Sequence, residues 1–92
     1  MNTVIRQRLA AAAQDVRIRE VLTILYRDHP QGASFDGVKD MLFLHDDFDE
    51  AQLKQLVDER VLMFDGTRYK ITADAQQVLD RDPVILMDEF LR

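Results

Sequence analysis

Residues 59–72 decide the fold, and they read Glu-Arg-Val-Leu-Met-Phe-Asp-Gly-Thr-Arg-Tyr-Lys-Ile-Thr. Residues 61–64 are a short apolar run. Residues 67–71 alternate with the two-residue period of a strand that has one solvent-facing side. Asp65-Gly66 between them is typical of a type I′ turn, whose two central residues need a positive φ. The stretch therefore predicts a β-hairpin. Because a lone two-stranded hairpin is only marginally stable in water, it must pack against the rest of the chain.

The first part of the chain predicts helices. Residues 3–27 carry apolar side chains at spacings of three and four, and they form either one long helix or two helices that divide near Gln14 and Asp15. In the second case Asp15 is a suitable N-cap. His29-Pro30 ends this segment because proline disfavours helical geometry in the residue before it. Ser34 is then the expected N-cap of a short second helix, which contains Gly37.

A third helix is expected over residues 48–59. Asp47 with Glu50 three residues later resembles a capping box at its start. The period places Leu53 and Leu56 on the inner side. Ala51, Gln55 and Asp58 face outward, and Gln52, Lys54 and Glu59 lie on the flanks.

Two further helices are expected after the hairpin. Thr72 caps a fourth helix whose inward positions are Ala75, Val78 and Leu79. Asp82-Pro83 then starts a C-terminal helix over residues 83–91, which is very apolar for a chain end and has to be buried. The sequence thus predicts a mainly α fold with a small β-hairpin, a single winged helix-turn-helix domain over residues 1–92. We expect two copies of the chain to form a homodimer through helices 3–27 and 83–91.

Composition limits the class of protein. A chain of 92 residues fits one small domain, and 47% apolar with 32% charged residues indicates a globular chain. The absence of cysteine excludes disulfides and thiolate chemistry. No apolar run approaches the roughly 18 residues of a membrane span, so we expect a cytoplasmic protein. Residues 1–27 hold five arginines against two acidic residues, a charge of +3, while the rest of the chain carries −8.

The chain resembles the winged-helix regulators of bacteria and phages, in the broad MarR, PadR and ArsR grouping. The resemblance is carried by residues 56–62 (LVDERVL), residues 69–75 (YKITADA) and Leu79, and it spans residues 18–79. In that grouping a glycine usually stands where this chain has Arg60, and often where it has Ala75. The resemblance implies that residues 48–59 form a DNA-recognition helix, that the hairpin tip at 65–68 lies beside the DNA backbone, and that terminal helices dimerise.

On this hypothesis the third helix and the hairpin contact DNA. Glutamine amides pair with adenine edges and an alanine methyl contacts thymine, while lysine and arginine bind phosphates. The expected DNA-binding residues are Ala51, Gln52, Lys54, Gln55, Arg68 and Lys70, with Arg60 as a further phosphate contact. Arg6, Arg17 and Arg19 form a basic face for DNA, or they pair with the acidic body of a partner subunit.

The acidic residues support an alternative. Asp46, Asp47, Asp49 and Glu50 at the entrance of the third helix favour its dipole, yet they repel phosphates over about a Debye length, roughly 8–10 Å. The alternative function is a winged helix that binds a protein partner through an acidic third helix, without DNA.

Catalysis, metal and cofactor binding are not expected. The cluster around His45 lacks the glycine and the terminal glutamate of a calcium-binding loop. Two histidines without a serine or cysteine nucleophile make no triad, and the three glycines are too scattered for a phosphate loop. An enzyme is therefore not predicted.

Overall fold

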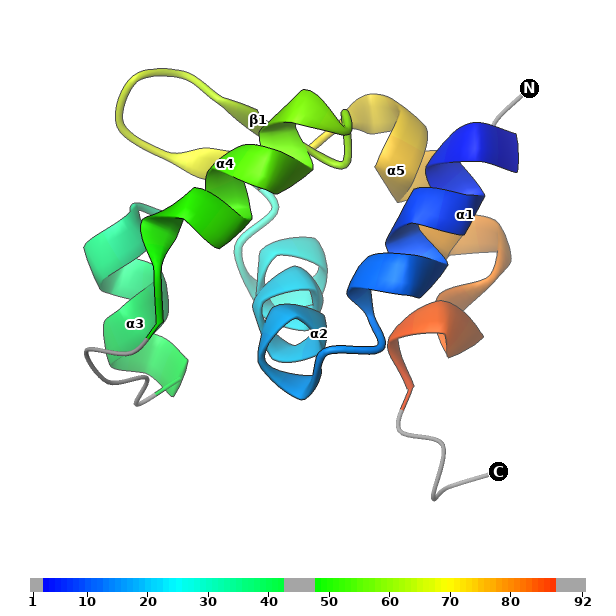
Figure 1. Cartoon of the computed structure of the whole chain (residues 1–92), viewed down its shortest axis with the longest axis horizontal. Coiled ribbons are helices and arrows are strands. Elements are labelled where there is room, and N and C mark those ends of the chain that lie inside the picture. The colour runs from blue at the N-terminus through cyan, green and yellow to red at the C-terminus, as the bar shows by residue number, and fades with distance from the viewer. Residues whose placement is uncertain (1–2, 43–47, 88–92) are drawn as a thin grey trace.

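The computed structural model describes residues 3–42 and 48–87, which are mainly helical with one small antiparallel sheet (Figure 1). The α-helices are α1 (Thr3–Ala12), α2 (Val16–Thr23), α3 (Phe35–Leu42), α4 (Glu50–Asp58) and α5 (Ala73–Arg81). A π-helical turn, η1 (Ile24–Asp28), extends α2, and a 3₁₀ turn, η2 (Pro83–Leu86), follows α5. The strands are β1 (Leu62–Phe64) and β2 (Tyr69–Ile71). A mainly α fold with a small hairpin is therefore confirmed. None of these helices is long and apolar enough to cross a membrane.

The N-terminal segment forms two helices, so the single helix over 3–27 is wrong. Asp15 is extended (φ −82°, ψ 119°), and its carboxylate accepts a hydrogen bond from the backbone N of Arg17 at 2.9 Å. This is the N-cap that the sequence predicts for the two-helix alternative. The second helix continues as η1 to Asp28, where the backbone N of His29 donates to the carbonyl of Ile24 at 2.9 Å.

Side-chain caps also begin α3 and α4. The Ser34 hydroxyl accepts from the backbone N of Gly37 at 3.1 Å, as expected for α3. For α4 the predicted capping box is wrong, because the helix begins at Glu50 and its N-cap is Asp49, which accepts from the backbone N of Ala51 at 2.9 Å. Asp47 itself lies outside the described residues.

The hairpin pairs Leu62 with Ile71, Met63 with Lys70 and Phe64 with Tyr69. On its other side Tyr69 exchanges two backbone hydrogen bonds with Ala33, at 2.8 and 2.9 Å, so β2 lies between β1 and the segment before α3. Gly32 permits this approach. Its φ is +100°, and a Cβ there would lie 2.9 Å from the carbonyl oxygen of Tyr69.

The predicted type I′ turn is wrong. Gly66 has a φ of +102°, but Asp65 does not have a positive φ. The backbone N of Asp65 donates to the carbonyl of Arg68 at 3.2 Å, so the tip of the hairpin is Gly66-Thr67. The Asp65 carboxylate accepts from the backbone N of Thr67 at 2.9 Å and of Arg68 at 2.8 Å. These side-chain bonds replace the backbone geometry of a type I′ turn.

The helices and the hairpin share one hydrophobic core. Leu9 of α1, Leu22 of α2, Leu53 of α4 and Leu79 of α5 are fully buried, together with Tyr69 of β2. Helix α1 packs across α5 and η2 (Figure 1). The core therefore lies between these four helices and strand β2 of the hairpin.

The C-terminal helix expected over 83–91 is shorter within the described residues. Only η2 (Pro83–Leu86) is helical, and residues 88–91 lie outside the described part. Asp82 does not cap η2 with its side chain. Its carboxylate pairs with Arg6 of α1 instead. Ile85 and Leu86 pack against the core, while Val84 and Met87 are exposed.

Candidate functional site

Helix α4 has a buried face and an exposed face. Leu53 and Leu56 are buried against the core, and α4 contacts β1. Ala51, Gln55 and Asp58 are exposed, as the helical period predicts. The helix therefore presents one exposed face to solvent, which is mostly polar and includes Ala51.

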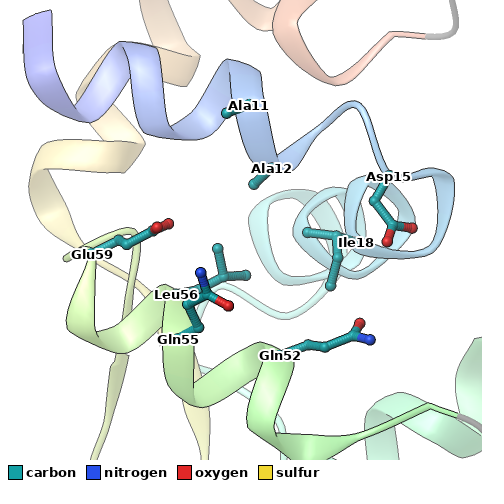
Figure 2. A pocket seen from close by; sticks show the side chains of 8 residues that line it. All are labelled: Ala11, Ala12, Asp15, Ile18, Gln52, Gln55, Leu56 and Glu59. Carbon is teal, nitrogen blue, oxygen red and sulfur yellow. The ribbon is translucent and has the colours of Figure 1, made fainter.

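The structure brings most of the predicted DNA-binding residues to exposed positions. Ala51, Lys54 and Gln55 are exposed on α4, and Arg68 and Lys70 are exposed on the hairpin. Gln52 differs from these five residues. It is half-buried, and its Oε1 is buried without a hydrogen-bond donor in the described part of the chain. Its side chain extends from α4 toward Ile18 and Asp15 (Figure 2).

Tyr69 fixes the hairpin to α4. Its backbone pairs with Ala33 and Phe64, and its hydroxyl donates to the Glu50 carboxylate at 2.7 Å. Desolvation by burial, together with this bond to Glu50, raises the pKa of Tyr69 to about 12. The hydroxyl is therefore a protonated donor throughout the neutral range. Sequence reasoning missed this role, because a tyrosine in an alternating strand signals only a half-buried aromatic.

The charges around α4 are mixed. Asp49, Glu50, Asp58 and Glu59 stand on this helix or its caps, against Lys54 alone. Of the carboxylates at the entrance of α4, Asp49 caps the helix and Glu50 accepts from Tyr69. The basic residues that follow α4 in the sequence are Arg60, Arg68 and Lys70, and all three are exposed at the hairpin.

The N-terminal arginines make contacts within the chain. Arg8 donates to the backbone carbonyl of Glu59 at 2.9 Å, and Arg19 to that of Ala13 at 3.1 Å. Arg17 lies 3.8 Å from the Asp15 carboxylate, and its guanidinium stands over the Phe48 ring at 5.9 Å from the centroid. Arg6 pairs with Asp82. Arg6, Arg8 and Arg17 thereby link α1 and α2 to segments much later in the sequence, whereas the Arg19 contact is local.

A pocket of about 270 Å³ lies between the α1–α2 corner and α4 (Figure 2). Its apolar walls are Ala11, Ala12, Ile18 and Leu56. Its polar residues are Asp15, Gln52, Gln55 and Glu59. Sequence reasoning missed the pocket because its two sides are about 40 residues apart, and no local pattern reports that they meet.

The described residues contain no group of three histidine or carboxylate side chains that could hold a metal ion. His45, Asp46 and Asp47 lie outside the described ranges.

No protein-family model, no curated protein and no solved structure matches this chain.

Proposed function

We propose that this chain is a winged helix-turn-helix protein that binds double-stranded DNA as a homodimer, as transcription regulators do. The order α2, α3, α4, β1 and β2 supports the proposal, together with the backbone pairing of Tyr69 with Ala33. This pairing adds a third extended segment beside the hairpin. On this proposal α4 is the recognition helix and the hairpin is the wing.

The observation that carries the proposal is the exposed face of α4. Ala51, Lys54 and Gln55 are exposed there, and Arg68 and Lys70 are exposed on the hairpin that packs beside α4. A helix that lies in the major groove reads base edges with its outer side chains. The Gln55 amide suits an adenine edge, the Ala51 methyl suits thymine, and the three cations suit phosphates.

The test is a selection from random duplex DNA followed by an affinity measurement across a salt series. Three phosphate contacts per protomer give six per dimer, so log K should fall against log salt with a slope of about −5. Absence of binding at low salt, or binding that does not respond to salt, would overturn the proposal.

Gln55→Ala tests the base-reading role. We expect a loss of about 1–3 kcal/mol in specific binding, because one bidentate amide contact is removed. The stability should change by less than about 0.5 kcal/mol, since Gln55 is exposed. Gln76→Ala is the matched control, since Gln76 is an exposed glutamine of α5 outside the proposed interface. Equal affinities for the two variants would remove Gln55 from the interface.

A second candidate function is a protein-interaction module. The observation in its favour is the excess of carboxylates on α4, where Asp49, Glu50, Asp58 and Glu59 outnumber Lys54. Such a face suits a basic segment of a partner protein. Binding of a lysine- and arginine-rich peptide that Asp58→Lys weakens, with no binding to DNA at low salt, would favour this candidate.

A further inference from the structure

We infer that the pocket between α1, α2 and α4 binds a small organic ammonium ion, a primary amine with a compact apolar body. The inference does not depend on DNA binding or on dimerisation. It rests on an unpaired buried acceptor, on the charge of the lining and on the shape of the apolar walls.

The acceptor is Oε1 of Gln52. This atom is buried, and no described residue donates a hydrogen bond to it. A buried acceptor without a donor raises the free energy of the folded state. Because this atom has almost no surface open to solvent, a ligand N–H supplies the missing donor once the Gln52 side chain rotates toward the pocket. Gln52 extends from α4 toward Ile18 and Asp15 at one end of the pocket (Figure 2). A bound donor is therefore expected at that end.

The charged lining is acidic. Among the residues that the structure describes, only Asp15 and Glu59 are charged and line the pocket. Asp15 is already engaged by Arg17, through its backbone N and its side chain. Arg8 donates to the backbone carbonyl of Glu59, and within the described residues the Glu59 carboxylate has no hydrogen bond or ion pair. In Figure 2 this carboxylate points into the space below α1. A cation is attracted to such a lining and an anion is repelled.

The walls select a compact apolar body. Ala11, Ala12, Ile18 and Leu56 form the apolar surface. A volume of about 270 Å³ holds about nine non-hydrogen atoms, if each takes the roughly 30 Å³ of a water molecule. This is smaller than the pockets that hold drug-sized ligands. An amine with one ring or a short branched chain fits this space.

The first experiment compares three probes of similar size on the full chain at neutral pH: 2-phenylethylammonium, 2-phenylethanol and phenylacetate. Titrations are followed by calorimetry and by amide NMR, including the side-chain amide of Gln52. We expect saturable one-site binding of the ammonium ion, weaker binding of the alcohol and none of the carboxylate. The NMR shifts should gather on residues 11–18 and on α4. No saturable binding of the ammonium ion, or equal binding of phenylacetate, would overturn the inference.

Paired variants then locate the charge. Glu59→Gln should weaken ammonium binding about tenfold, while Asp58→Asn should leave it nearly unchanged. Both variants remove one carboxylate from the same turn, but only Glu59 lines the pocket. If the two variants weaken binding equally, the effect is one of net charge, and the inference fails.

A second pair of variants tests the space. Ala12→Leu fills the pocket and should abolish binding, whereas Ala10→Leu, at an exposed position of α1 outside the pocket, should preserve it. Binding of the ammonium ion that survives in folded Ala12→Leu would contradict the inference. If Ala12→Leu does not fold, the Glu59 and Asp58 pair decides.

Discussion

At the scale of single residues, Arg60 stores backbone strain. Its φ is 65°, and no other described non-glycine residue has a positive φ. Arg60 follows the C-cap of α4, where the chain turns into β1, and this is the position at which the resemblance anticipates glycine. We expect Arg60→Gly to raise the free energy of unfolding by about 0.5–1 kcal/mol. The relief of left-handed strain should exceed the added entropy of the unfolded chain. Urea denaturation measures the change.

Glu59→Gly is the control for this prediction. Glu59 has an ordinary φ of −84°, so glycine relieves no strain there and should destabilise the fold by up to about 1 kcal/mol. The Thr72 hydroxyl donates to the backbone carbonyl of Arg60, which neither substitution removes, so this bond remains in both variants. Equal destabilisation by the two glycines would show that the left-handed turn is not strained.

The carboxylate of Asp65 makes the hairpin tip sensitive to acid. The backbone N–H groups of Arg68 and Thr67, in that order, hold the pKa of Asp65 below its ordinary value of 3.8. A group with a lowered folded-state pKa stabilises the fold above its unfolded pKa, and this contribution is lost as the pH falls through the folded pKa. Asp65→Ala should therefore destabilise the protein at neutral pH, and the difference from the parent should shrink in acid. A difference that is the same at all pH values would contradict this prediction.

At the scale of elements, the sequence predicts what local chemistry determines. The N-caps Asp15, Ser34 and Thr72 are all found where their spacing placed them, because each cap bond closes within two or three residues. The inward positions of α5 follow from its period for the same reason.

The first residue of α4 could not be predicted from local sequence alone. Asp47 and Asp49 are both good caps by chemistry, and contacts between distant residues favour the later start. Phe48 is buried and stacks on Phe35 with 5.9 Å between ring centroids, so it lies before the helix as part of the core. Glu50 accepts its hydrogen bond from Tyr69, 19 residues away, instead of closing a capping box. The pocket between α1 and α4 was unpredictable for the same reason.

The link between the hairpin and α4 yields a prediction for Tyr69→Phe. The loss of the hydroxyl leaves the half-buried Glu50 carboxylate without this donor, and we expect a loss of about 1 kcal/mol in stability. Since the pKa of Tyr69 is about 12, the loss should not depend on pH in the neutral range. A double-mutant cycle with Glu50→Gln isolates the pair, and additive effects of the two substitutions would contradict the coupling.

At the scale of the whole molecule, the positive charge of the N-terminal third is largely used within the chain. Arg6 pairs with Asp82, and Arg8 reaches the carbonyl of Glu59. These contacts attach α1 to the end of α5 and to the end of α4. Three apolar side chains stay exposed on or beside these elements: Val4 of α1, Val84 of η2 and Met87 at the C-cap of η2, by 54%, 38% and 49%. The two elements that carry these exposed side chains, α1 and η2, contact each other. We therefore propose that the two segments meet a second copy of the chain.

Val84→Glu tests that interface. In the dimer a glutamate at this position would be buried against an apolar surface, and its desolvation should shift the chain toward the monomer. Met63→Glu is the matched control, because Met63 is exposed by 46% on β1, at the hairpin and outside the proposed interface. Sedimentation across a concentration series should give a dimer for the parent and for Met63→Glu, and a weaker dimer or a monomer for Val84→Glu. Because Val84 is partly exposed within one chain, circular dichroism should show the same helix content in all three proteins. A monomeric parent, or equal dissociation of the two variants, would place the contact elsewhere or remove it.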